Sequence, residues 1–198
     1  GKLVQTGDIW VSSTGWTDRP DGLQVRFGDC ASGRMQFGNR VATRIKLETR
    51  DTSFTSHGTR LVGRLVLPAG NKPVPIVVLL HGAEPDSARD TNALQRMLPA
   101  AGIGAFVYDK RGTGASGDKY TQVFSLLADD AAAALAEARR MAGPRGARFG
   151  FQGPSQGGWI APLAATRTTV DFLIVSFGLA VSVADEDREA IAFQMGLK

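Results

Sequence analysis

Gly153-Pro154-Ser155-Gln156-Gly157-Gly158 decides the fold, because it follows a segment expected to form a buried strand, 148–152, and leads into a small-residue segment typical of a helix, 156–166. The hexapeptide fits the pattern G-x-S-x-G, whose structural meaning depends on lying between a strand and a helix. Flanking glycines remove side chains that would collide in so tight a turn, and the turn pushes the serine hydroxyl outward. Ser155 is therefore the candidate nucleophile, and the bland alternative is a serine in an ordinary glycine-rich turn.

Two loops of the sequence are expected to supply backbone donors to a developing negative charge. The helix that starts after Ser155 directs its first amides and its positive dipole end outward, so the Gln156 N–H is the first candidate. The nearly continuous apolar run 74–80 is typical of a strand buried on both faces, and it ends in His81-Gly82. The amide of Ala83 or Gly82 is the second candidate. For His81 itself we expect a structural hydrogen bond rather than the role of a base.

Alternation of strands and helices predicts the fold class. Residues 41–49 and 61–67 alternate on either side of a turn at Ser56-His57-Gly58 and predict a β-hairpin. After the strand 74–80, Asp86 or Ser87 is expected to cap one helix that runs to 101. Further strands are expected over 103–108, 148–152 and 171–177, and further helices over 121–141 and 156–166. The order predicts a three-layer α/β/α sandwich with a mostly parallel sheet.

Composition and charge exclude several classes of protein. The 198 residues are 43% hydrophobic and 21% charged, which is typical of a globular protein, and no apolar stretch is long enough to span a membrane. The net charge of +4 comes from residues 1–64, which hold 10 Lys and Arg against 6 Asp and Glu; residues 65–198 hold 13 of each. Because these basic residues are scattered singly, we expect no nucleic acid as a partner. The compartment cannot be read from the sequence.

Three segments, taken in order, resemble the α/β-hydrolase superfamily, in particular its bacterial lipases, esterases and serine-peptidase-like members. They are Val77-Val78-Leu79-Leu80-His81-Gly82, Tyr108-Asp109-Lys110-Arg111-Gly112-Thr113-Gly114-Ala115-Ser116-Gly117, and the turn at Ser155; the resemblance covers about 61–178. It implies an acyl-forming nucleophile at Ser155, with Gln156 and the residue after His81-Gly82 as the oxyanion hole. Pro154 stands where relatives often have His, and Gln156 where many have Glu.

The resemblance also divides the chain. Residues 1–40 are expected to form an irregular β-rich extension, 41–178 the hydrolase core, and 179–198 the start of a lid or cap helix with a capping pair at Ser182 and Asp185. In this fold the catalytic acid and histidine follow the nucleophile, yet both histidines of this sequence precede Ser155. We therefore expect a core that is incomplete at its C-terminus. A following segment or a second chain would carry the Asp or Glu and the His.

Other motifs have simpler interpretations. Gly112-Thr113-Gly114-Ala115-Ser116-Gly117 fits the dinucleotide pattern G-x-G-x-x-G, but its glycines come three residues late, after Asp109 and Arg111, for which we expect structural polar contacts. Cys30 lies in a Gly/Asp-rich loop without a second Cys, so neither a disulfide nor a metal site is expected. No cofactor is expected.

The sequence therefore predicts a serine hydrolase that cleaves small-molecule carboxylic esters through an acyl-enzyme. Two alternatives stay open. One is a peptidase or amidase of the same fold, since the residues that line the substrate pocket decide that choice. The other is a hydrolase-like binding module that has lost its catalytic triad and recognises a ligand or partner.

Overall fold

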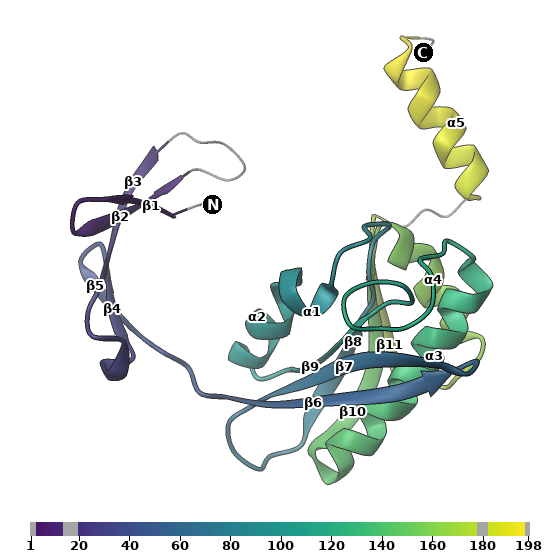
Figure 1. The fold of residues 1–198 in the computed structure, drawn as a ribbon, viewed down its shortest axis with the longest axis horizontal. Coiled ribbons are helices and arrows are strands. Elements are labelled where there is room, and N and C mark those ends of the chain that lie inside the picture. The colour runs from purple at the N-terminus through teal and green to yellow at the C-terminus, as the bar shows by residue number, and fades with distance from the viewer. Residues whose placement is uncertain (1–2, 14–19, 178–181, 197–198) are drawn as a thin grey trace. The chain divides into compact units, whose positions relative to one another are not determined.

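The computed structural model describes residues 3–13, 20–177 and 182–196 and divides the chain into two compact units, Gly1–Lys46 and Leu47–Lys198 (Figure 1). The sequence predicted that residues 41–46 belong to the hydrolase core, which corresponds to the second unit. They belong to the first because β5 (Arg40–Thr43) pairs antiparallel with β4 (Arg34–Phe37) and completes a sheet there.

The first unit is a five-stranded antiparallel sheet in which each strand pairs with the next one along the chain. Its remaining strands are β1 (Leu3–Thr6), β2 (Ile9–Ser13) and β3 (Pro20–Phe27), and a single 3-10 turn, η1 (Cys30–Ser32), precedes β4. Tight turns between neighbouring strands contain glycines with positive φ, such as Gly7 and Gly38. The sequence predicted an irregular β-rich extension over 1–40; the described strands are instead paired in a regular antiparallel sheet.

The second unit is built on a six-stranded mixed sheet with the order β11-β10-β8-β9-β7-β6. Strands β8, β9, β10 and β11 are mutually parallel, and a hairpin of β6 and β7 joins the sheet through an antiparallel pairing of β7 with β9. The first strand of this hairpin was predicted over 41–49, but it lies over 47–56, so that prediction is wrong in its bounds. The bounds are β6 (Leu47–Ser56), β7 (Thr59–Pro68), β8 (Val74–Leu79), β9 (Gly104–Asp109), β10 (Gly146–Pro154) and β11 (Phe172–Ser176).

Helices cover both faces of this sheet, which confirms the predicted three-layer α/β/α class (Figure 1). Alternate residues of β8 point to opposite faces, as strand geometry requires. Ile76 and Val78 pack with α3 (Phe124–Ala142) and α4 (Gln156–Ala165), whereas Val77 and Leu79 pack with α1 (Ala88–Thr91) and α2 (Leu94–Ala100). A 3-10 turn, η2 (Gly143–Arg145), links α3 to β10, and α5 (Val183–Gln194) begins at Ser182, whose hydroxyl accepts a hydrogen bond from the Asp185 N–H.

The helix expected to run from Asp86 or Ser87 to 101 is interrupted, and that prediction is wrong in this respect. Helix α1 ends at Thr91, and α2 starts three residues later at Leu94. Ser87 occupies the N-cap position of α1 but makes no side-chain capping bond; its hydroxyl donates to the Asp109 carboxylate at 2.7 Å instead. A long-range polar contact has therefore replaced the local cap that the sequence predicted.

His57 lies in the tight turn between β6 and β7 with φ of 47°, and its Nε2 is 2.9 Å from an Asp129 carboxylate oxygen of α3. Both side chains are exposed, at 57% and 36%, so water screens the pair.

We expect His57→Ala to change the free energy of unfolding by less than about 1 kcal/mol, because exposed ion pairs contribute little. Urea denaturation of the full-length protein measures this. His57→Asn is the matched control, since asparagine tolerates positive φ while removing the imidazole. A loss of more than about 2 kcal/mol in the alanine variant alone would contradict this prediction.

Candidate active site

Ser155 lies in the one-residue connection between β10 and α4, with φ of 50° and ψ of −124°. Positive φ is uncommon for a residue with a side chain, and here the surrounding backbone holds it. The Ser155 N–H donates to the Ser176 carbonyl at the end of β11 (3.0 Å), and its carbonyl accepts from the Gly158 N–H (2.7 Å). Fixed from both sides, Ser155 remains exposed at the carboxyl end of the parallel strands.

The flanking glycines are required by packing rather than by flexibility. A Cβ atom on Gly153 would lie 2.0 Å from the Gly157 carbonyl oxygen, and a Cβ atom on Gly157 would lie 2.8 Å from the His81 carbonyl oxygen. Both contacts are with backbone, which cannot yield easily. The G-x-S-x-G pattern therefore lets the turn, the start of α4 and the loop after β8 approach one another closely.

A cavity of about 280 Å³ opens beside Ser155. It is lined by Pro154 and Ser155 on one side and by residues of the loop after β8, including His81, Gly82 and Glu84, on the other. The structure therefore brings Ser155 and Gly82 to one cavity. Gln156 follows Ser155 directly and belongs to the first turn of α4, whose amides have no acceptor within the helix. Ala83 follows Gly82 and is exposed.

His81 is half-buried in this cavity. Burial is the largest influence on its imidazole and lowers its pKa to about 4; the nearby Lys110 ammonium lowers it as well, and Glu84, Asp109 and Asp86 oppose these effects. The ring is thus neutral at pH 7. Its Nε2 has no hydrogen-bond partner among the residues that the structure describes, so the structural hydrogen bond expected for His81 is not made by that atom.

Buried polar contacts hold the end of β9 and the loop that follows it in place. Asp109 accepts hydrogen bonds from the Ser87 hydroxyl (2.7 Å) and from the backbone N–H groups of Arg89 (3.2 Å) and Ala115 (3.1 Å). Arg111 forms a two-pronged ion pair with Asp130 of α3, at 2.7 and 3.0 Å. The structural polar role expected of Asp109 and Arg111 is the one observed.

Lys110, between these two residues, is a site residue that the sequence interpretation missed. Its Nζ donates to the Gly82 carbonyl at 2.7 Å and lies 3.4 Å from the Gln156 Oε1, so it links the two loops that flank the cavity. Its ammonium is also 4.9 Å from the centre of the Tyr120 ring. Burial lowers the Lys110 pKa to about 8, with Glu84 acting in the opposite direction. The sequence signal that could have indicated a buried lysine is its position directly after a buried strand, between Asp109 and Arg111.

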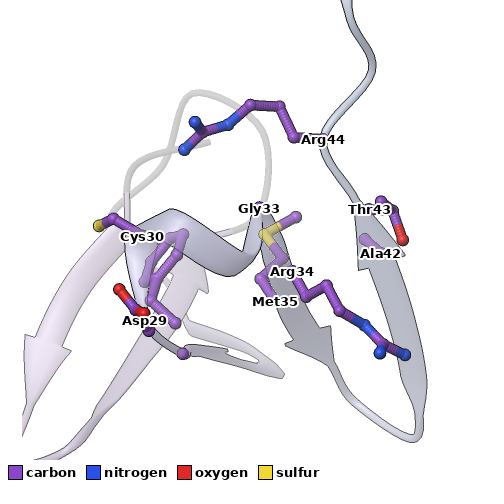
Figure 2. A pocket seen from close by; sticks show the side chains of 10 residues that line it. Asp29, Cys30, Gly33, Arg34, Met35, Ala42, Thr43 and Arg44 are labelled. Atoms are coloured by element: carbon purple, nitrogen blue, oxygen red, sulfur yellow. The ribbon is translucent and has the colours of Figure 1, made fainter.

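A second cavity, of about 270 Å³, lies in the first unit (Figure 2). Its lining includes Cys30, Arg34, Met35 and Arg44. Figure 2 shows that the Cys30 thiol and the two guanidinium groups point in different directions rather than toward one centre. This arrangement lacks a nucleophile paired with a base, and the chemistry of the chain is better sought at Ser155.

Within the described residues, no three or more His, Cys, Asp and Glu side chains gather as a metal site requires. None of the helices in the same part of the chain is both long and apolar enough to cross a membrane.

Comparisons with known proteins agree with this architecture. The family model described as serine aminopeptidase, S33, matches residues 71–192. The solved structures that resemble this one include a hypothetical protein, PA2218, of Pseudomonas aeruginosa, with a TM-score of 0.58 and 19% identity over 76% of this chain and 52% of that one. For the Pyrococcus furiosus esterase Pf2001 the TM-score is 0.53 and the identity 23%, over 63% of this chain and 49% of that one. For the esterase Est22 the TM-score is 0.52 and the identity 19%, over 61% of this chain and 39% of that one.

At these identities the structural likeness shows the fold alone, and the chain spans about half the length of the first two structures. No curated protein sequence matches the chain. The family model, in contrast, covers more than half of the chain and includes the β8 loop, the β9 loop and the turn at Ser155. The chain therefore belongs to the S33 serine aminopeptidase family of the α/β-hydrolase superfamily.

Proposed function

We propose that this chain carries the nucleophile and the oxyanion hole of a serine hydrolase that cleaves carboxylic esters through an acyl-enzyme on Ser155. The observation that carries the proposal is the conformation of Ser155: its φ of 50° and ψ of −124° hold an exposed side chain in a fixed turn between β10 and α4. The turn also borders the same cavity as Gly82. A strained serine at this position in the fold is typical of a nucleophile.

Two backbone amides would stabilise the oxyanion. The Gln156 N–H lies at the start of α4, where the helix dipole favours negative charge. The Ala83 N–H, with that of Gly82 as the alternative, belongs to the loop on the opposite side of the cavity. Such preorganised donors are commonly the largest single contribution to acyl transfer.

The proposed reaction has two steps, acylation of Ser155 and hydrolysis of the acyl-enzyme. A base takes the hydroxyl proton as Ser155 Oγ attacks the carbonyl carbon, the carbon to leaving-oxygen bond breaks, and the alcohol departs with that proton. Water then attacks the carbonyl carbon of the acyl-enzyme, and the same base takes a proton from that water. The bond from the carbonyl carbon to Ser155 Oγ breaks, the base returns the proton to Oγ, and the acid product is released.

For the base and the acid we propose a segment outside this chain, either a continuation or a second polypeptide, that carries a His and an Asp or Glu. Both histidines of the chain precede Ser155, contrary to the order of this fold. Strand β11 pairs with β10 on one side, and three of its apolar side chains are 39–46% exposed: Leu173, Ile174 and Val175. A complementing strand would cover them. Helix α5 would begin the lid.

A peptidase or amidase of the same fold is the second candidate, and the aminopeptidase description of the family favours it. The two similar structures described as esterases favour the first. A binding module without a complete triad is the candidate from another class. Rates on p-nitrophenyl esters and on aminoacyl p-nitroanilides separate the two enzymatic candidates.

Labelling with a fluorophosphonate tests the proposal as a whole. We expect the protein that includes the segment with the base to form a covalent adduct, and peptide mass spectrometry to locate it on Ser155, because the probe phosphonylates only an activated serine. Heat-denatured protein is the control. A folded protein that gains no adduct at Ser155 would favour the binding module and overturn the proposal.

A further inference from the structure

Lys110 and Tyr120 hold two successive carbonyl groups of the loop proposed to form the oxyanion hole. The Lys110 Nζ donates to the Gly82 carbonyl at 2.7 Å, and the Tyr120 hydroxyl donates to the Ala83 carbonyl. The contacts on this loop therefore call for a functional explanation.

The first contact determines the direction of an amide. Gly82 C=O and Ala83 N–H belong to one peptide unit, and no described peptide bond is cis. In a planar trans unit the carbonyl and the N–H point in opposite directions. A donor fixed on the Gly82 carbonyl from the protein interior therefore turns the Ala83 N–H away from Lys110.

The second loop is held by the same ammonium. The Lys110 Nζ lies 3.4 Å from Oε1 of Gln156, the residue whose backbone N–H is the other candidate donor. Lys110 is only 3% exposed, and Gln156 likewise 3%. Buried hydrogen bonds to a charged donor are stronger than neutral ones, so one side chain ties both halves of the hole together.

The glycine-rich loop explains how Tyr120 reaches this position. Gly112 has φ of 72°, its N–H donates to the Gly117 carbonyl at 2.9 Å, and a Cβ atom on it would lie 1.9 Å from the Tyr120 backbone nitrogen. The pattern that resembles a dinucleotide motif thus closes a tight loop. That loop brings the Tyr120 ring to 4.9 Å from the Lys110 ammonium, within the range of a cation–π contact.

We propose that Lys110, together with Tyr120, is a positioning residue that fixes the Gly82–Ala83 peptide so that the Ala83 N–H points at the substrate oxyanion. The inference rests on the proposed function of Ser155. Lys110 touches neither the nucleophile nor the substrate in this scheme. Its positive charge also polarises the peptide through the Gly82 carbonyl and makes the Ala83 N–H a better donor.

Lys110→Met tests this inference, because methionine keeps the length of the side chain and removes the ammonium. In the full-length protein we expect kcat on a p-nitrophenyl ester to fall about 10- to 100-fold while KM changes less than about threefold, since an oxyanion donor acts in the transition state. Tyr120→Phe, which keeps the ring, should lower kcat by a smaller factor, about tenfold. Lys119→Met is the matched control on the same loop, because Lys119 is exposed, and it should leave kcat unchanged.

The alkaline side of the pH profile gives a readout that a merely structural lysine would not change. Because the Lys110 pKa is lowered to about 8, we expect wild-type kcat to decline as the pH rises through that value, and this decline should be absent in Lys110→Met. The titratable groups around Lys110 are His81 and Glu84 of the β8 loop, Asp109 of β9 and Tyr120. His81, whose pKa is lowered to about 4, is already neutral there.

The outcomes are distinguishable. If the wild-type protein forms no adduct at Ser155, the proposed function fails and this inference fails with it. If the wild type is labelled and Lys110→Met keeps kcat within twofold, only the inference is overturned. Should Lys110→Met not fold, an unchanged kcat in the folded Tyr120→Phe variant would overturn it equally.

Discussion

Ser155→Ala is expected to lower the hydrolysis rate of the full-length protein by at least about 10⁴-fold, because the proposed acyl-enzyme forms on the Ser155 hydroxyl. Thr91 is the other hydroxyl among the described residues that line the cavity, and it already donates a hydrogen bond to the Ser87 carbonyl at 2.8 Å. The residual rate should come from the oxyanion donors and from substrate binding alone.

The same substitution should leave the fold intact, which makes the result interpretable. The Ser155 side chain is exposed, whereas the hydrogen bonds that hold its turn are made by backbone atoms, to Ser176 and Gly158. Alanine retains these bonds and strains the positive φ no more than serine does. We therefore expect the unfolding temperature to stay within about 2 °C of that of the wild type.

Ser53→Ala, an exposed serine of β6, is the matched control and should retain full activity. Initial rates on p-nitrophenyl butyrate and labelling by a fluorophosphonate should fall together in Ser155→Ala. Activity retained within tenfold would mean that a different residue is the nucleophile.

The architecture around Ser155 could be predicted because its causes are local. A short segment expected to form a strand, glycines where a side chain would clash, and a helical pattern after them all lie within 20 residues of Ser155. The structure supplies physical reasons: the part of β10 next to the turn, residues 150–153, is buried, and Gly153 and Gly157 have backbone atoms close to where a Cβ would lie. Local steric requirements of this kind leave a signature in the sequence.

Long-range polar contacts left no such signature. Ser87 was expected to cap a helix, but it donates to Asp109, 22 residues later. Lys110 reaches Gly82, 28 residues earlier in the chain, and Gln156, 46 residues later. A lysine in a glycine-rich loop is ordinarily solvated, so only the fold shows that this one is buried. The partners of a buried charge depend on which strands become neighbours, and the sequence pattern alone does not specify those side-chain contacts.

Asp130→Ala is expected to destabilise the second unit more than any surface substitution, because it removes the main partner of a buried guanidinium. Arg111 is 3% exposed and Asp130 is fully buried, with the two hydrogen bonds between them at 2.7 and 3.0 Å. Breaking such a pair typically costs about 3–5 kcal/mol. For a protein of this size, that corresponds to a fall in unfolding temperature of about 6–20 °C.

The loss of stability caused by Asp130→Ala should be the same at neutral and at moderately alkaline pH. The hydrogen bonds that Arg111 donates to Asp130 raise its pKa above the ordinary value; burial opposes this, and the hydrogen bond donated to Asp118 adds to the rise. A raised pKa in the folded state stabilises the fold below the unfolded-state value and loses that contribution only as the pH rises through the folded-state value. Both values lie above the range in which thermal unfolding is measured. The wild-type advantage should therefore be the same at pH 7 and pH 9.

Asp129→Ala is the matched control, since Asp129 is the adjacent residue of α3 but pairs at the surface with His57 and Arg167. It should cost about 1 kcal/mol or less. The double variant Arg111→Met, Asp130→Leu should recover much of the loss, because an apolar pair of similar volume avoids the cost of burying charge. If Asp130→Ala were as mild as Asp129→Ala, the hydrogen bonds from Arg111 to Asp118 and to the Ser56 carbonyl would have to hold the guanidinium by themselves. The ion pair between Arg111 and Asp130 would then not be the contact that holds the loop after β9 in place.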